Sequence, residues 1–109
     1  MDTDKLKQNY LPMTETAYYI LLSLHEAKHG YGIMQHVETL TEGRINIGAG
    51  TMYGTLSKLE KENLIIQEKE IDRKKIYKLS TKGQKVLMLE LERLEKLLKD
   101  GKNEIGGLK

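Results

Sequence analysis

The chain contains no cysteine, tryptophan or phenylalanine, and its 109 residues include one proline. Without cysteine it can form no disulfide framework, thiolate nucleophile or cysteine-ligated metal site. No apolar run approaches the length of a membrane span, and the first five residues lack the basic-then-apolar order of a signal peptide. We therefore expect a soluble, cytoplasmic chain without membrane contact, whose small core dimerisation would help to stabilise.

Charge is distributed unevenly along the chain, although the net charge is only +2. Residues 1–43 carry three basic and six acidic side chains, whereas residues 44–85 carry ten basic and five acidic ones. Residues 86–109 carry five of each. The positive excess therefore falls in the centre of the chain, where it suits a phosphate-binding face. An ordinary solvated charged face is the alternative.

The stretch 48–64 predicts a helix of about four turns whose start is loosened by glycine. Met52, Leu56 and Leu59 recur at helical spacing, which places one apolar stripe toward a core. The opposite side would carry small, hydroxyl-bearing and basic residues: Gly50, Thr51, Gly54, Thr55, Lys58 and Lys61. A short helix of this kind fits the major groove of DNA. By itself the stretch fits an amphipathic surface helix equally well.

Two helices are predicted before this one. Residues 1–12 are polar and irregular, and we expect an arm or a short helical piece there. Thr14 is the expected cap of a buried helix that reaches about residue 27. Helical periodicity resumes at Tyr31 and continues to Gly43, which suits a left-handed stop. Residues 45–47 alternate and suggest a short strand.

Two β-branched runs, 64–71 and 75–80, flank a polar turn and predict a hairpin. Three consecutive cations, Arg73, Lys74 and Lys75, lie at or near its tip. Two helices, a groove helix and a basic hairpin in this order make up a winged helix-turn-helix arrangement. The groove helix would contact base edges, and the hairpin would lay its cations along the neighbouring phosphates.

Thr81 is the expected cap of a last helix that ends at Gly101. Its leucines recur four, three and four residues apart: Leu87, Leu91, Leu94 and Leu98. At about 25 cal/mol per Å², leaving this stripe in water is costly, so we predict a partner helix from a second copy. The alternative is a helix that folds back onto its own domain. We expect a DNA-binding domain at 1–80, a dimerisation helix at 81–101 and a disordered tail at 102–109.

Several segments with their spacing are similar to a known family. They are Gly-Tyr-Gly-Ile at 30–33, Gly-Thr-Met-Tyr at 50–53, Leu-Ser-Lys-Leu-Glu at 56–60, and Lys-Ile-Tyr-Lys-Leu-Ser-Thr-Lys-Gly at 75–83. Together they resemble the PadR family of bacterial transcriptional regulators, over residues 13 to about 100. The resemblance implies a mainly α fold with a small hairpin, and a homodimeric repressor on a palindromic operator. Members with one C-terminal helix often control exporters or stress genes.

Some of those members respond to small aromatic or amphipathic compounds, which makes such an effector a possible partner here. With no tryptophan or phenylalanine, tyrosines or leucines would have to bind an aromatic effector. Ala49 stands where many members have proline at the helix start. Asn63 stands where glycine commonly ends that helix, and asparagine tolerates the left-handed conformation, so we expect the turn to persist.

The roles of three residues stay open. The resemblance places Tyr53 on the DNA side, whereas its spacing favours packing with the hydroxyl outward. Tyr31 could donate to a phosphate near a helix N-terminus or be buried against the core. Lys61 could contact a distal phosphate or be simply solvated. In the hairpin, Arg73 could enter the minor groove.

Other chemistry finds little support in the sequence. His25, His29 and His36 are near one another, but no cysteine assists them, and we expect capping or surface roles rather than a zinc site. No nucleophile–base set or phosphate loop is present, so we expect neither an enzyme nor a cofactor. A protein–protein adaptor is the competing hypothesis, because winged helices also dock proteins.

Overall fold

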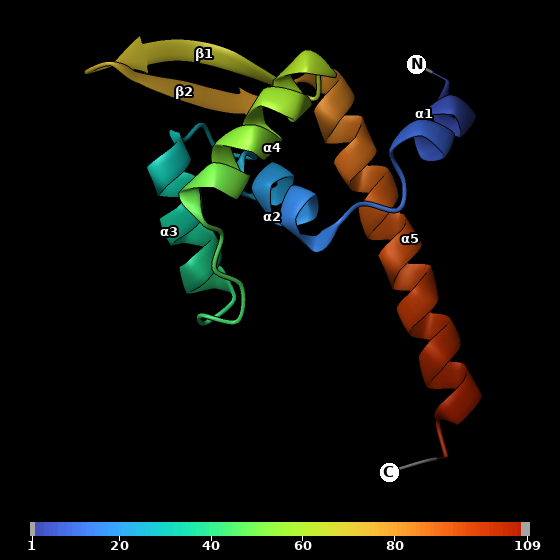
Figure 1. Ribbon diagram of the computed structural model, residues 1–109. Helices are drawn as coiled ribbons and strands as arrows, with labels where there is room; N and C mark the ends of the chain where they lie inside the picture. The colour runs from blue at the N-terminus through green and yellow to red at the C-terminus, as the bar shows by residue number, and fades with distance from the viewer. Residues whose placement is uncertain (1, 108–109) are drawn as a thin grey trace.

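The computed structural model describes residues 2–107, which form five helices and one two-stranded antiparallel sheet. The elements are α1 (Thr3–Tyr10), α2 (Glu15–Ser23), α3 (Gly30–Leu40), α4 (Ala49–Lys61), β1 (Ile65–Ile71), β2 (Lys74–Leu79) and α5 (Thr81–Ile105). In Figure 1 the hairpin projects from the cluster of α2, α3 and α4, while α5 runs past α2 and extends well beyond it. The predicted fold class, a winged helix-turn-helix with a long C-terminal helix, is confirmed.

Side-chain caps determine where three of the helices begin. Asp2 accepts the backbone N–H groups of Asp4 and Lys5, and Thr14 accepts that of Ala17 at 3.1 Å, as predicted. The expected cap at Thr81 is wrong by one residue. The hydroxyl of Ser80 accepts the Gly83 N–H at 2.9 Å and donates to the Asn63 carbonyl at 2.6 Å, so it fixes the start of α5 against the end of α4.

Two connections differ from the sequence-based expectation. The helix α2 ends at Ser23, before the expected residue 27, because residue 28 leaves the helix to pair with the hairpin. The backbones of Lys28 and Tyr77 exchange two hydrogen bonds, of 3.0 and 2.8 Å. The expected strand at 45–47 is a loop, in which the Thr41 hydroxyl accepts the Ile45 N–H. Gly43 has a φ of 79°, the predicted left-handed stop.

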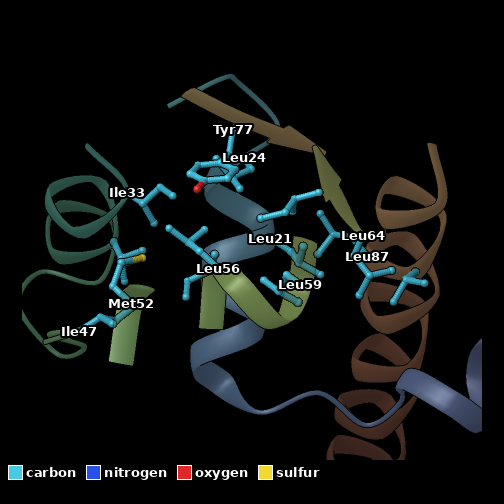
Figure 2. Close-up of a cluster of buried hydrophobic side chains, with 14 of the residues drawn as sticks. Leu21, Leu24, Ile33, Ile47, Met52, Leu56, Leu59, Leu64, Tyr77 and Leu87 are labelled. Carbon is cyan, nitrogen blue, oxygen red and sulfur yellow. The ribbon is translucent and has the colours of Figure 1, made fainter. Parts of the chain in front are cut away.

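The core lies between α2, α3 and α4 and is closed by the base of the hairpin and the first half of α5. Its fully buried side chains come from all of these elements: Ile20, Leu21, Leu24, Ile33, Val37, Met52, Leu56, Leu64, Ile65 and Val86. Figure 2 shows that Leu21 and Leu59 lie between the α3 side and Leu87 of α5. The core therefore holds α4 and the hairpin in a fixed relation to each other.

The start of α5 approaches the start of β1 so closely that only glycine fits. A Cβ on Gly83 would lie 1.8 Å from the carbonyl oxygen of Leu64. Lys82 beside it donates to the Glu62 carbonyl at 3.1 Å, and its ammonium lies 4.9 Å from the centre of the Tyr10 ring. These contacts join α1, α4 and α5 at one point.

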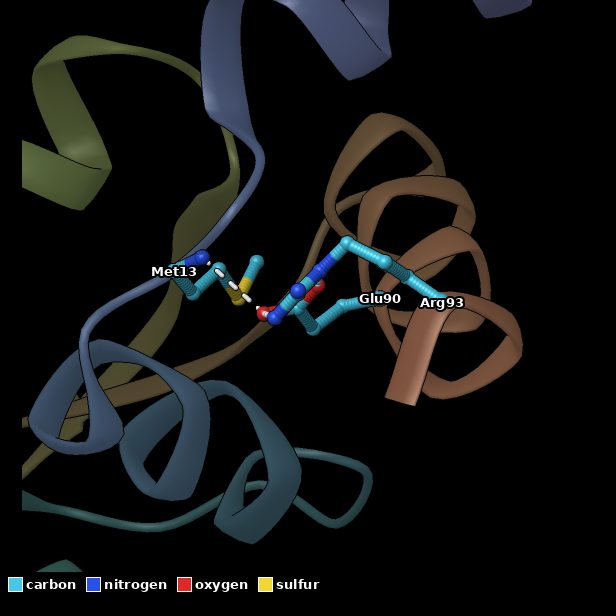
Figure 3. A network of polar contacts seen from close by, with 3 residues as sticks. All are labelled: Met13, Glu90 and Arg93. Carbon is cyan, nitrogen blue, oxygen red and sulfur yellow. Dashed lines mark hydrogen bonds and ion pairs between the residues drawn. The ribbon is translucent and has the colours of Figure 1, made fainter. Parts of the chain in front are cut away.

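A buried carboxylate connects α5 to the segment between α1 and α2. Glu90 is 1% exposed, and its Oε2 accepts the Met13 N–H at 2.9 Å and an Arg93 guanidinium N–H at 3.0 Å (Figure 3). Burial alone would raise the pKa of the Glu90 carboxyl, but the hydrogen bonds from Arg93 and Met13 and the charge of Arg93 outweigh it and lower that pKa. The group is therefore a paired carboxylate that orients the N-terminal segment.

The C-terminal helix is longer than expected. It continues through Gly101 to Ile105, so the expected break at Gly101 is wrong and residues 102–105 are helical. Gly101 faces open space and nothing there stops the helix. Residues 108–109 of the expected disordered tail lie outside the described residues. The chain measures 55 Å along its longest axis because the second half of α5 extends away from the core.

Candidate nucleic-acid interface

The helix α4 is positioned by its buried stripe. Met52, Leu56 and Leu59 are 5% exposed or less, so the opposite face of the helix points to solvent. That face presents most of the residues predicted from spacing: Gly50, Thr51, Gly54, Lys58 and Lys61 are all exposed. Thr55 is half-buried and lies toward the α1–α2 connection. The predicted outward face of α4 is therefore largely present.

The two glycines of that face have no packing role inside the protein. A Cβ on Gly50 or Gly54 would meet nothing within 4 Å. Glycine in a helix costs stability relative to alanine, so its presence at two exposed positions on one face needs another reason. Their effect is a flat strip of backbone that a ligand can approach closely. Gly48 at the N-cap also leaves the first N–H groups of α4 without a side-chain cap.

The wing is a hairpin with a two-residue turn. Asp72 and Arg73 both have positive φ, 50° and 65°, which is the twist that a tight hairpin turn requires. Lys74 and Lys75 open β2, where Lys75 lies opposite Glu70. Arg73, Lys74 and Lys75 are all exposed. The three predicted cations therefore do lie at the tip.

A groove separates the wing from α3 and α4, and we call it the wing groove. Its volume is about 410 Å³, and its lining includes Arg73, Lys74 and Lys75 from the wing and Tyr31 and Tyr53 from the helices. The structure thus brings the wing cations and both predicted tyrosines to one surface. One edge of α4 also lines this groove, so the wing cations lie next to the helix that was predicted to enter the major groove. This arrangement can take up an anion beside α4.

Both tyrosines are about half exposed. Tyr31 is 56% exposed, so the alternative of burial against the core is wrong for it. Tyr53 is 53% exposed, yet its ring covers Gly30, where a Cβ would lie 2.7 Å from its Cε1 atom. Tyr53 therefore packs on α3 and also lines the wing groove, and its place on the DNA side stays a prediction. Burial, and then the charges of Glu60 and Tyr53, raise the pKa of Tyr77 at the groove floor, so it stays a neutral donor.

A second groove lies on the other edge of α4, and we call it the linker groove. Its volume is about 430 Å³, and it runs between α4 and residues 9–14. Thr55 and Lys58 line it together with Thr14 and a carboxylate-bearing residue, Glu62. The predicted residues of α4 thus divide between two edges of the helix rather than forming one cluster.

Five residues of the wing groove were not among the predicted site residues: His29, Gly30, Leu56, Ser57 and Tyr77. Ser57 follows Tyr53 by one helical turn, so the periodicity that identified Tyr53 could have included it. His29 precedes α3, and no sequence signal places it here, because its position depends on how the wing lies over the start of α3.

The second half of α5 carries an exposed apolar face. Leu91 and Leu94 are each 36% exposed, and Leu98 is 59% exposed. Leu87 is 5% exposed and belongs to the core of its own chain, so the expectation that it contacts a partner does not fit. Ile105 continues the face beyond the predicted end of the helix. The surface offered by α5 is therefore displaced toward the C-terminus relative to the prediction.

Membrane-spanning helices and metal clusters are both absent from residues 2–107. No helix in this range is both long enough and apolar enough to cross a membrane. No group of three or more histidine, aspartate and glutamate side chains within the same range is arranged to hold a metal ion.

Comparison with known proteins identifies the family. The model of the transcriptional regulator PadR-like family matches residues 20–89. A PadR-like transcription factor from Bacteroides fragilis is 35% identical over 83% of this chain and 88% of its own, with a TM-score of 0.65. A PadR family regulator from Eggerthella lenta is 26% identical over 86% of this chain and 83% of its own, with a TM-score of 0.64.

A transcriptional regulator from Clostridium thermocellum shares the fold over 100% of this chain and 99% of its own, with a TM-score of 0.71 at 22% identity. None of the curated proteins compared with the chain matches it. The matched family model spans α4 and the whole wing, which form the surface described above. The chain therefore belongs to the PadR-like family of transcriptional regulators, and it is a DNA-binding regulator with a winged helix fold.

Proposed function

We propose that this protein is a sequence-specific repressor that binds a palindromic operator as a homodimer in the cytoplasm. The observation that carries the proposal is the wing groove, where Arg73, Lys74 and Lys75 lie beside the exposed edge of α4. An exposed helix with a flat glycine strip suits the major groove, and cations beside it suit the flanking phosphates. In this proposal Gly50, Gly54 and the Thr51 hydroxyl face base edges.

The remaining predicted residues contact the DNA backbone in this proposal. The hydroxyls of Tyr31 and Tyr53 and the ammonium of Lys58 would bind phosphates at the two edges of α4. Thr55 is half-buried and would reach only a phosphate that enters the linker groove. Lys61 lies at the C-terminal end of α4 and would contact a distal phosphate.

The apolar face of α5 supports the homodimer. Leu91, Leu94 and Leu98 do not fold back onto the core, and in water they cost about 25 cal/mol for each Å² exposed. A second copy of the same helix would cover them, and the two-fold symmetry of such a pair would match an operator of two inverted half-sites. Residues 1–80 would then bind DNA and α5 would join the protomers, although Val86 and Leu89 of α5 also complete the core.

Repression follows in this proposal if the dimer occupies a promoter and blocks it. An aromatic or amphipathic effector would release the dimer from DNA by binding better to a conformation that does not fit the operator, and its contacts would come from tyrosines and leucines. Adding such compounds to a DNA-binding assay tests this part. An effector must weaken binding at a concentration that leaves the protein folded.

The proposal is tested by recovering bound duplexes from randomised DNA. We expect enriched sequences with two inverted half-sites, centred about one helical turn apart. The competing adaptor hypothesis predicts no enrichment. Recovery of a single half-site would contradict only the homodimer part of the proposal. Recovery of no duplex would contradict DNA binding itself.

A further inference from the structure

The wing groove contains a histidine side chain that the proposed function does not use. His29 precedes the first residue of α3 and lines the groove with the wing cations. It stands at the N-cap position but makes no side-chain hydrogen bond to the helix. A Cβ on Gly32 would lie 3.1 Å from His29 Nδ1, so the imidazole lies directly over the first turn of α3. Its ring centre is 6.4 Å from that of Tyr31.

The charges around His29 favour an anion in the groove. From the wing, Arg73, Lys74, Lys75 and the neutral Tyr77 face it, and α4 contributes the hydroxyls of Tyr53 and Ser57. No carboxylate belongs to the lining, among the residues that the structure describes. The linker groove, by contrast, includes Glu62. A single anion can therefore contact cations or hydroxyls on three sides.

The acidic side chains of the neighbouring segments do not belong to the lining of the wing groove. Glu26 on the loop before α3 lies 4.0 Å from His25, and Glu70 faces Lys75 across the hairpin. Asp72 is exposed in the hairpin turn, and Glu60 lies on α4 near Tyr77. Lys28, next to His29, donates to the Ser23 carbonyl at 2.8 Å. The charged side chains that share the lining of the groove with His29 are thus the three wing cations.

We propose that His29 contacts a phosphate of the DNA backbone held in the wing groove, and that it does so more strongly when protonated. This inference rests on the proposed function, because it needs a duplex to supply the phosphate. Histidine is the side chain whose charge ordinarily changes between about pH 5 and 8. A phosphate bound beside an imidazole favours the protonated form of the ring. DNA binding therefore takes up a proton at His29.

Each phosphate neutralised by a cation releases condensed counterions, so the number of such contacts appears in the salt dependence of binding. A protonated His29 adds one contact for each protomer. The slope of log K against log salt concentration should therefore be steeper at about pH 6 than at about pH 8 by about 0.9 per protomer. Affinity should also be higher at the lower pH.

The test measures binding of a selected operator duplex at several salt concentrations and both pH values. It compares the wild-type protein with His29→Gln, and with His25→Gln as control, since the His25 side chain is 55% exposed and pairs with Glu26 outside the groove. In the wild-type protein and in His25→Gln we expect the salt slope to be steeper at the lower pH than at the higher pH. In His29→Gln we expect the same slope at both pH values, equal to the wild-type slope at the higher pH.

The wild-type measurement alone can overturn the inference, whether or not the variants fold. Salt-dependent binding with the same slope at both pH values would show that DNA binding is correct and that His29 makes no charged contact. A pH-dependent slope that persists in folded His29→Gln would assign the proton to another group. Absence of binding at both pH values would overturn the proposed function and this inference together.

Discussion

At the scale of single residues, Glu90 shows how one buried carboxylate stabilises the N-terminal segment. Its oxygens receive the Met13 N–H and the Arg93 guanidinium, and its side chain lies in the interior. A buried carboxylate that keeps its charge through such partners contributes to stability, because removing a partner leaves a desolvated polar group. The stability of the region around Met13 should therefore depend on pH.

We predict that Glu90→Gln lowers the free energy of unfolding by about 1–3 kcal/mol at neutral pH. Because the folded state lowers the pKa of Glu90, the unfolded state binds the proton more readily. The difference in free energy of unfolding between variant and wild type should be present in full above pH 4.5, the usual pKa of this carboxyl group. It should decline as the pH falls from there through the lowered pKa of the folded state.

Urea unfolding at a series of pH values measures this difference. Glu92→Gln serves as the control, because Glu92 is exposed and pairs with the exposed Lys96 at 3.4 Å, so its loss should change stability little. An equal effect of the two substitutions would contradict the account of Glu90.

At the scale of elements, α4 combines a buried apolar stripe with an exposed face whose glycines make the helix less stable than alanines would. Alanine at an exposed helical glycine normally stabilises, and Gly54 has open space around it. We predict that Gly54→Ala raises the free energy of unfolding by about 0.5–1 kcal/mol and weakens DNA binding, because the added methyl group blocks close approach. Thermal unfolding and operator titration of the same preparation measure the two effects.

A second glycine provides the contrast within the same experiment. Gly83→Ala would place a methyl group against the Leu64 carbonyl, so this substitution should lower stability. If Gly54→Ala stabilised the protein and left DNA affinity unchanged, the glycine strip of α4 would not be a contact surface.

The elements of the fold could be predicted to the extent that local chemistry determines them. The Thr14 cap, the stop at Gly43 and the hairpin each follow from side chains or backbone preferences close in sequence. The N-cap of α5 at Ser80 could not be predicted, because two adjacent hydroxyls can cap this helix and the Ser80 hydroxyl is the one that also binds the distant Asn63 carbonyl. The early end of α2 likewise depends on pairing with Tyr77, which is distant in the chain.

The residues of the candidate site were largely predictable, but the groove that they form was not. Helical periodicity identified the exposed face from sequence alone. The wing groove depends on how the hairpin lies over α3, and this tertiary relation brought in His29, whereas Ser57 lies one helical turn from Tyr53 and was within reach of periodicity. The same reason explains Leu87: its spacing matches the outer leucines, but the core reaches one turn farther along α5 than periodicity can indicate.

At the scale of the whole molecule, α5 connects the core to the proposed partner. We predict that Leu91→Glu with Leu94→Glu gives a monomer in sedimentation, because four added charges could not be buried between two helices. The control is Asp100→Asn with Glu104→Gln, which also changes the charge of α5 by two, at exposed positions outside the surface that Leu91, Leu94 and Leu98 line. A dimer that persisted in the leucine variant would place the interface elsewhere on the molecule.

The central claim is that the wing cations and α4 form one surface for duplex DNA. The most direct measurement is the affinity for the operator duplex as a function of salt concentration, in the wild-type protein and in Arg73→Ala with Lys74→Ala. We predict steep salt dependence in the wild-type protein. In the variant we predict weaker binding to every duplex, with a slope shallower by about 0.9 for each phosphate that the wing no longer neutralises. A slope that the double substitution left unchanged would contradict the account.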